Sequence, residues 1–547
     1  MKNLFRLLGF YTLILCFTAS FAQTDKLSVI NNVNLESKKL KARQAYLSYD
    51  YPTAVRLYNE ILAMKPTDAE AAFHLGECFQ EQNDNDQAIT YFEKAEKEDP
   101  VCDDNLHLKL GISYQQTIKL DSAITEFNKY KELVKNSASR INQSGVDQYI
   151  QQCKTAKDLM AHPVNVKIDN LGEAVNTSYD EKSPSVTADG KMLIFTSQRP
   201  LTQVPKDENG NDDLLDNVYS AKWDSVNKKW ALSYPVEGFV NSSNDKTACS
   251  SISPDGLIMF IYKNNNSDAI GGDIYISKRE RSGRWGQPKS IGKPINTSYY
   301  EDCATLSPDG NTLFFISEKP GGYGNADIYS SEKISKDQWT EPVNLGPVIN
   351  TAYDEGGMSM APDGKTLFFS STGHNSMGSY DIFKSVKNDS GEWSEPVNLG
   401  YPINSVNTDV SFTMSADTRY AYFASNRKGG LGGRDIYRVD LTAYPLLGSS
   451  NGKGVATGLS ILRGKISDSK GKPIQDASVT INDSTNTKVA SLKTNSEGLY
   501  FITLKANSKY KIRVAYKGYK SSNTPVKLPS SPTGTYTMTE DIMLEKE

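Results

Sequence analysis

The sequence predicts a multidomain chain in which an all-α helical repeat array precedes a five-bladed all-β propeller and a β-sandwich. Three observations predict this order: residues 35–135 repeat every 34 to 35 residues, residues 163–441 repeat every 54 residues after a first copy that is 12 residues longer, and residues 460–547 alternate polar with apolar side chains. Fixed periods of this length indicate repeat architectures. An alternation of period two is typical of strands with one buried face. The 547 residues are enough for three or four domains of roughly 150 residues each.

The composition disfavours some classes of function. The net charge is -4, whereas a nucleic-acid-binding protein needs a basic surface. Only 4 His and 6 Cys are present, which disfavours a His-rich metal centre and a disulfide scaffold. We therefore expect no nucleic-acid partner and no cofactor, and consider Ca²⁺ only at the acidic column described below.

The first 22 residues read as a secretory signal. Lys2 and Arg6 precede a short apolar run over residues 7–17, and Ser20 and Ala22 provide small residues for cleavage after Ala22. The alternative is a lipoprotein with Cys16 as the lipidated residue. Since no later run is long enough to span a bilayer, we expect an exported chain that is soluble or peripheral to a membrane.

The helical array is predicted over residues 35–160. Small, aromatic and helix-ending residues recur in register: Ala54, Ala88 and Ala123; Tyr58, Phe92 and Phe127; Gly76 and Gly111; Pro66 and Pro100. Small residues suit the close crossing of two helices, and proline ends a helix. Such an array is either a solvated spacer or a groove for a partner protein.

The middle of the chain, residues 163–441, holds five copies of a unit with four short strands, which is typical of a propeller blade. Its columns are spaced by 54 residues: Asp255, Asp309 and Asp363; Trp285, Trp339 and Trp393; Asn296, Asn350 and Asn404. The fifth copy lacks its last strand, but Asn170 and Gly172 match Asn344 and Gly346 at a distance of 174 residues. Residues 164–172 should therefore complete the last blade and remove an open edge.

The end of the chain is expected to form a linker, residues 442–459, and a β-sandwich, residues 460–547. The linker is rich in Gly and Ser. About seven short alternating strands, separated by turn residues such as Lys470-Gly471 and Lys517-Gly518, favour a sandwich.

Each part resembles a known family. The first resembles tetratricopeptide repeats; the second resembles WD40-like repeats of the TolB type through Ser-Pro-Asp-Gly at 253–256 and 307–310; the third resembles the carboxypeptidase regulatory-like, or transthyretin-like, domain through Gly464, Asp468, Gly498 and Tyr500. Their order resembles that of PorE-like proteins of the OmpA family. That resemblance implies a periplasmic protein, associated with the outer membrane and with partner proteins of type IX secretion or gliding. Members of that family continue into an OmpA-like peptidoglycan-binding domain. This sequence stops at Glu547, so we do not expect peptidoglycan binding.

A candidate ligand site lies at the predicted start of each innermost strand. This column is mostly acidic: Glu181, Thr247, Glu301, Glu355 and Asp409. Carboxylates gathered near one mouth of the ring could hold a cation such as Ca²⁺ or a basic peptide. The alternative is that they cap loops and point to solvent.

Two further columns are predicted to be structural. Asp273, Asp327, Asp381 and Asp435 follow Gly-rich loops and should accept loop N–H bonds. Small residues, Ser183, Cys249, Cys303, Gly357 and Ser411, suit the narrow end of a wedge, where Cys249 and Cys303 either pack closely or form a disulfide.

The sequence predicts no enzyme, since it has no Gly-x-Ser-x-Gly motif and its four His are far apart. The first hypothesis is a scaffold for envelope proteins. The second is an envelope protein whose propeller binds a glycan, peptide or cation. The third is a hydrolytic propeller that uses the acidic column.

Overall fold

A computed structural model describes residues 33–136, 143–201, 215–241, 247–264, 271–335, 338–447, 458–529 and 535–547. The chain divides into two compact units, Met1–Cys153 with Lys206–Asn211 and Lys154–Pro205 with Asp212–Glu547, which are described separately. The predicted signal sequence with Ala22, and most of the predicted linker, lie outside the described residues. No helix within the described ranges has the length and apolarity needed to cross a bilayer.

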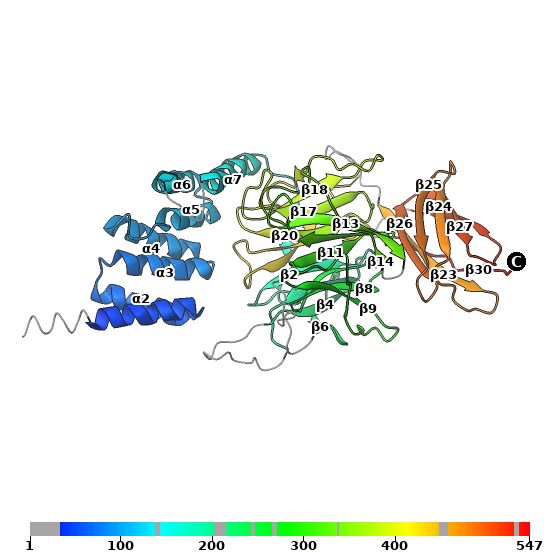
Figure 1. Ribbon diagram of the computed structural model, residues 1–547, viewed down its shortest axis with the longest axis horizontal. Coiled ribbons are helices and arrows are strands. Elements are labelled where there is room, and N and C mark those ends of the chain that lie inside the picture. Colours follow the sequence, from blue (N-terminus) through cyan, green and yellow to red (C-terminus); the bar gives the residue numbers. More distant parts are fainter. Residues whose placement is uncertain are drawn as a thin grey trace, which may run out of the picture. The chain divides into compact units, whose positions relative to one another are not determined.

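The first unit is a stack of antiparallel helices (Figure 1). A helix over residues 33–47 is followed by α2 (Tyr51–Met64), α3 (Ala69–Glu81), α4 (Asn85–Glu98), α5 (Leu106–Gln116), α6 (Leu120–Leu133), a short 3-10 helix η1 (Val134–Asn136) and α7 (Gln143–Ala161). The side chains of Asp50, Asp68 and Asp84 accept backbone N–H bonds at the starts of α2, α3 and α4. These caps satisfy N–H groups that have no partner inside a helix.

Close packing between paired helices explains the repeated small residues. A Cβ atom on Gly76 would lie 2.6 Å from two ring carbons of Phe92, and one on Gly111 would lie 2.6 Å from a ring carbon of Phe127. Phe92 and Phe127 are fully buried. Glycine therefore stands where an aromatic ring of the next helix lies against the backbone.

The second unit begins with five antiparallel sheets (Figure 1). The first strands of these sheets are β2 (Glu181–Val186), β7 (Thr247–Ile252), β11 (Glu301–Leu306), β16 (Glu355–Met360) and β20 (Asp409–Met414). The second strands are β3 (Met192–Ser197), β8 (Ile258–Lys263), β12 (Thr312–Ser317), β17 (Thr366–Ser371) and β21 (Tyr420–Ser425). The third strands are β4 (Asn217–Asp224), β9 (Asp273–Lys278), β13 (Asp327–Ser335), β18 (Asp381–Val386) and β22 (Asp435–Asp440).

Short outer strands complete these sheets. They are β5 (Lys229–Trp230), β6 (Tyr234–Pro235), β10 (Lys289–Ser290), β14 (Gln338–Trp339), β15 (Val343–Asn344), β19 (Val397–Asn398) and β1 (Lys167–Asn170). β1 pairs with β22, so that Lys167 lies opposite Asp440 and Asn170 opposite Tyr437. This pairing is the one that the 174-residue spacing predicts. Two sheets carry a fifth short strand, β6 or β15, beside the predicted four.

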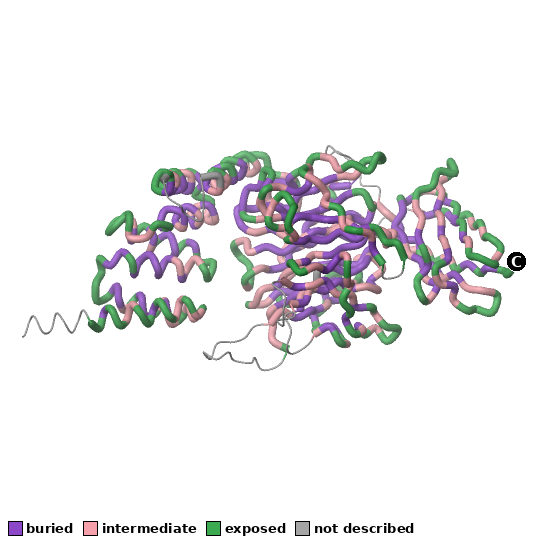
Figure 2. Tube along the Cα trace, in the orientation of Figure 1, coloured by how far each residue is buried: buried purple, intermediate pink, exposed green. Residues whose placement is uncertain are grey.

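The first strands of the five sheets contact one another in a closed order. β2 contacts β7, β7 contacts β11, β11 contacts β16, β16 contacts β20, and β20 returns to β2. Figure 2 shows that the strands in the middle of this region are largely buried. The five sheets therefore surround a common centre, with their first strands innermost.

The remaining residues form two small sheets around one apolar core. One contains β23 (Leu459–Asp468), β26 (Leu499–Lys505), β29 (Thr537–Thr539) and β30 (Ile542–Leu544); the other contains β24 (Ser478–Asp483), β25 (Lys488–Lys493), β27 (Ser508–Ala515) and β28 (Ser522–Leu528). The described residues thus hold eight strands rather than about seven. β29 and β30 pair in parallel with β23 and have only three residues each, too few to show an alternation.

This sandwich-like part contacts the turns that join the first and second strands of the ring. Ile461 packs with Ala188 and Ala416. The hydroxyl of Thr503 donates to the carbonyl oxygen of Pro362, and the side-chain amide of Asn311 donates to that of Ser491. These contacts fix one end of the ring of first strands against β23 and β26.

Candidate functional site

The acidic column lies at the first residue of four innermost strands, but its side chains are buried. Glu301 accepts the backbone N–H of Thr297 at 2.8 Å and the hydroxyl of Ser317 at 2.9 Å. Glu181 and Glu355 make the same bonds within their own sheets, and Asp409 accepts the backbone N–H of Ser405 at 2.7 Å. Thr247 is buried as well. These carboxylates hold the preceding loop in four of the five copies, and none of the four faces solvent.

Two of these carboxylates lie beside an arginine, whereas a neutral histidine lies near the carboxylate of the fourth copy. The Arg427 guanidinium pairs with Asp409, and Arg199 Nε lies 3.5 Å from Glu181 Oε1. In the fourth copy His374 takes the place of the arginine, and its Nε2 lies 2.9 Å from the carbonyl oxygen of Ile349. Burial raises the pKa of Glu355 to about 7, although Thr351 and Ser371 donate hydrogen bonds to it.

The second column of aspartates holds the loops that precede the third strands. Asp327 accepts the backbone N–H groups of Tyr323 at 2.6 Å and Gly324 at 3.0 Å. Asp435 accepts the equivalent bonds of Leu431 and Gly432. Asp381 accepts the N–H of Met377, and burial raises its pKa to about 8. Burial also raises the pKa of Asp273, whose preceding loop lies outside the described residues.

Two asparagine columns connect these aspartates to the sheets. Asn344 donates to Asp327 at 2.9 Å and accepts a bond from Asn350, which exchanges two bonds with the backbone of Ile328. In the last sheet Asn170 and Asn176 make the same bonds to Asp435 and Ile436. The 54-residue spacing reveals these columns, but only the structure shows that one copy of the network joins the two ends of the ring.

The column of small residues marks a β-bulge in the first strands. Ser183, Cys303 and Ser411 have φ angles of 51°, 51° and 59°. The pairing of β11 with β12 shifts between Asp302 and Thr305. A bulge turns the strand locally, which is why small residues and Gly357 occupy this column. Cys303 is not in a disulfide, and the side chain of Cys249 lies outside the described residues.

A group of tyrosines and carboxylates, which we call the tyrosine–carboxylate group, lies near the starts of the first strands. The rings of Tyr262 and Tyr300 are 5.2 Å apart, and the hydroxyl of Tyr300 donates to Asp302 at 3.1 Å. Burial and the nearby Asp302, Glu318 and Asp216 raise the pKa of Tyr262 to about 12. The sequence does not reveal this group, because its positions hold different residue types in the other copies.

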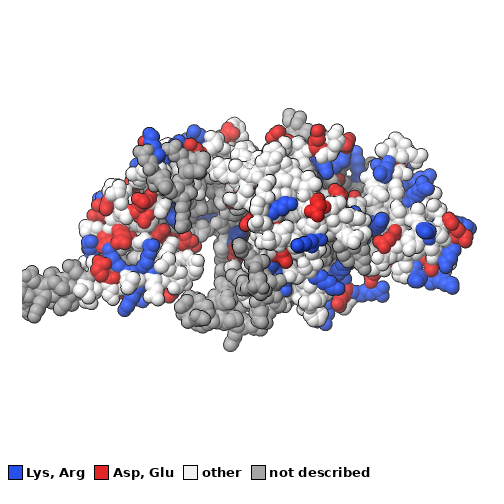
Figure 3. All heavy atoms as spheres, viewed as in Figure 1, with Lys and Arg blue, Asp and Glu red and all other residues white. Residues whose placement is uncertain are grey.

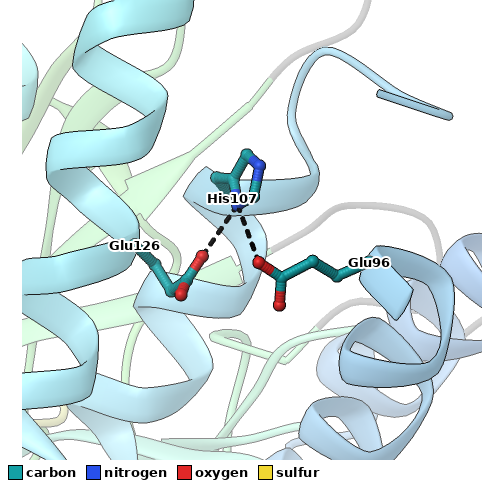
Figure 4. A group of neighbouring side chains, drawn as sticks. All are labelled: Glu96, His107 and Glu126. Atoms are coloured by element: carbon teal, nitrogen blue, oxygen red, sulfur yellow. Dashed lines mark hydrogen bonds and ion pairs between the residues drawn. The ribbon is translucent and has the colours of Figure 1, made fainter. Parts of the chain in front are cut away.

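In the helical unit, Glu96, His107 and Glu126 come together from α4, α5 and α6 (Figure 4). His107 Nδ1 lies 2.7 Å from Glu126 Oε2 and 3.8 Å from Glu96 Oε1. Lys129 Nζ lies 2.6 Å from Glu96 and 2.9 Å from Glu126. The pKa of Glu126 is lowered overall. Burial alone would raise it, but the hydrogen bonds from His107 and Lys129 favour the charged carboxylate and outweigh the effect of burial. The sequence does not reveal this cluster, because the spacing of its three residues matches no metal motif.

A row of charged residues crosses the first helices of the three hairpins; we call it the first-helix row. Arg43 Nη1 lies 2.9 Å from His74 Nε2, and His74 Nδ1 lies 2.8 Å from Glu77. Glu77 lies 3.9 Å from Lys109 on the next first helix. Figure 3 shows acidic and basic residues interspersed on the viewed face of the molecule. The row itself carries both signs of charge, since Arg43 and Lys109 are basic and Glu77 is acidic.

Two segments match protein-family models. Residues 45–111 match the tetratricopeptide repeat, and residues 461–540 match the carboxypeptidase regulatory-like domain. The chain thus contains tetratricopeptide repeats and a carboxypeptidase regulatory-like domain. A search of curated proteins gives no match.

Several solved structures are similar to parts of the chain. The TPR2B domain of yeast Sti1, in a complex with pHsp70, is 18% identical; the match covers 22% of this chain and 95% of that chain with a TM-score of 0.21. The type III secretion translocator chaperone SycD of Yersinia enterocolitica is 20% identical, over 23% of this chain and 86% of that chain, with a TM-score of 0.22. The 3-chlorocatechol 1,2-dioxygenase of Rhodococcus opacus 1CP is 12% identical, over 16% of this chain and 60% of that chain, with a TM-score of 0.14.

Proposed function

We propose that this protein is a non-enzymatic, exported scaffold that docks partner proteins at the periplasmic side of the outer membrane, within a type IX secretion or gliding apparatus. The observation that carries the proposal is the tetratricopeptide match over residues 45–111, because stacked helical hairpins present an extended surface to protein segments. We further propose that the five sheets form a five-bladed propeller of the WD40-like type, closed by β1.

The first-helix row supports a docking role. It crosses successive hairpins, so an extended segment lying along the array would meet Arg43, Glu77 and Lys109 in turn. Their mixed charges favour a partner segment that carries both acidic and basic side chains. Charge complementarity of this kind selects partners and sets their register.

A pull-down from solubilised envelopes tests the scaffold proposal. The variant carrying Arg43→Glu and Lys109→Glu should recover about tenfold less of any partner, because it reverses two charges of the row. Lys97→Glu, on the second helix of its hairpin, is the matched control and should recover as much as the wild type. Equal recovery by all three proteins would contradict a role for the row.

The tyrosine–carboxylate group favours a second candidate function, the binding of a cationic ligand at the ring. Aromatic faces and carboxylates together suit a basic peptide. Recovery of no partner in the pull-down, together with a thermal shift of the β-rich unit on adding a basic peptide, would replace the first proposal with this one. Fractionation with and without detergent tests the proposed association with the outer membrane.

A further inference from the structure

We propose that Glu96, His107 and Glu126 form a binding site for a divalent transition-metal ion such as Zn²⁺, which would join α4, α5 and α6. This site is independent of the proposed scaffold function. It is built from three consecutive helices, of which α4 belongs to the second hairpin and α5 and α6 belong to the third. A bound ion would therefore fix the junction between the second and third hairpins.

Two of the three distances between the ligand atoms need only small adjustments. One ligand atom from each residue lies within 4.8 Å of the others. Tetrahedral Zn²⁺ with bonds of about 2.0–2.1 Å places its ligand atoms about 3.3 Å apart. The 2.7 Å distance between His107 Nδ1 and Glu126 would have to widen by about 0.6 Å, and the 3.8 Å distance to Glu96 would have to shrink by about 0.5 Å. Side-chain rotations of the two glutamates provide such shifts.

The chemistry of the donors favours zinc over calcium. An imidazole nitrogen and carboxylate oxygens are donors that Zn²⁺ binds, whereas Ca²⁺ takes oxygen ligands in larger numbers. His107 and Glu126 are buried, with side chains 7% exposed, and Glu96 is 26% exposed. A hollow lined by Pro100, Val101, His107, Lys129 and Leu133 adjoins the cluster. It gives an ion access from solvent and leaves room for water as a fourth ligand.

Lys129 shows that this position favours positive charge. Its ammonium bridges Glu96 and Glu126 in the metal-free arrangement. Its side chain is 43% exposed, so it can turn into solvent when an ion enters. With neutral His107, two carboxylates and Zn²⁺ make a neutral cluster. Lys129 is therefore an internal competitor, and its removal should tighten metal binding.

Zinc titration of the full chain by calorimetry tests the proposal. The wild type should bind one Zn²⁺ at this site, and Lys129→Met should bind it about tenfold more tightly because the competing ammonium is gone. His107→Gln should bind about 100-fold more weakly than the wild type. His74→Gln is the matched control, since His74 lies beside only one carboxylate and an arginine. The affinity of this variant for Zn²⁺ should equal that of the wild type.

A second readout and a second variant keep the test decisive. Zn²⁺ should raise the unfolding temperature of the helical unit in the wild type and in Lys129→Met, and Ca²⁺ should not. If His107→Gln fails to fold, Glu96→Gln at the more exposed ligand replaces it and should weaken binding similarly. Absence of zinc binding in both the wild type and Lys129→Met, or binding that survives both ligand variants, would overturn the site.

Discussion

At the scale of single residues, the hydrogen-bond partners of the acidic column show that its carboxylates hold loops within the protein. The sequence locates Glu181, Glu301, Glu355 and Asp409 at the starts of innermost strands, and the structure has them there. Their burial could not be predicted, because it depends on donors four residues before each acid and, for the three glutamates, on a hydroxyl sixteen residues after it. A column of like charges in a sequence therefore does not distinguish a shared ligand site from a bond repeated in every copy.

The carboxyl of Glu355 gives a pH-dependent prediction. Its pKa is about 7 in the folded protein against 4.5 for the ordinary group, so between pH 4.5 and 7 the folded state binds the proton more tightly than the unfolded state. The free energy of unfolding should therefore decrease by about 3 kcal/mol as the pH rises through this window. Thermal unfolding of the β-rich unit at pH 5 and pH 8 measures the change.

The matched comparison is Glu355→Gln, which removes the titrating group. Its stability should vary less between the two pH values than that of the wild type, while Asp381 and the other raised carboxyls still contribute to both proteins. Asp409→Asn should instead destabilise the protein at pH 8, because it leaves the Arg427 guanidinium without its carboxylate. An unchanged pH dependence in Glu355→Gln would refute the assignment.

At the scale of elements, the sequence predicts helices and strands well wherever copies can be aligned. The glycine at position 76 illustrates why: the alignment marks a small residue, and the structure places the ring of Phe92 against it. Elements that occur only once in the chain are harder to predict. The short parallel strands β29 and β30 and the cluster around His107 depend on contacts between distant segments that no local pattern records.

Gly76→Ala tests the close crossing of α3 and α4. The added Cβ would lie 2.6 Å from the buried Phe92 ring, so the variant should lose about 1–3 kcal/mol despite the better helix propensity of alanine. Circular dichroism at 222 nm during denaturation measures the loss. Combining Gly76→Ala with Phe92→Leu should recover part of it, since the smaller side chain makes room. If the double variant loses the sum of both single effects, the two positions do not interact.

At the scale of the whole β-rich unit, closure depends on one copy of a repeated network. Asn176 makes the same three bonds at the junction of the two ends that Asn350 makes inside the ring. The period in the sequence predicts both the missing strand and the segment that replaces it.

Asn176→Ala and Asn350→Ala should therefore destabilise the ring by similar amounts, about 1–3 kcal/mol for each buried group left without a partner. Only Asn176→Ala should expose the edge of β22. Hydrogen exchange should accordingly become faster in β1 and β22 for that variant, with association at high concentration. If hydrogen exchange in β1 and β22 is no faster in Asn176→Ala than in the wild type, or if both variants associate equally, the junction has no special role.

The pairing of β1 with β22 also has a consequence for the order in which the chain is made. Asp169 pairs with Arg438, 269 residues later. At about 5–20 residues per second, β1 waits roughly 15–50 s for its partner strand. During that time it is an unpaired strand of four residues, Lys-Ile-Asp-Asn, with two charges and one aliphatic side chain. A short, charged strand resists pairing with other chains, so the segment that closes the ring is also suited to emerging first and remaining alone until synthesis reaches the other end.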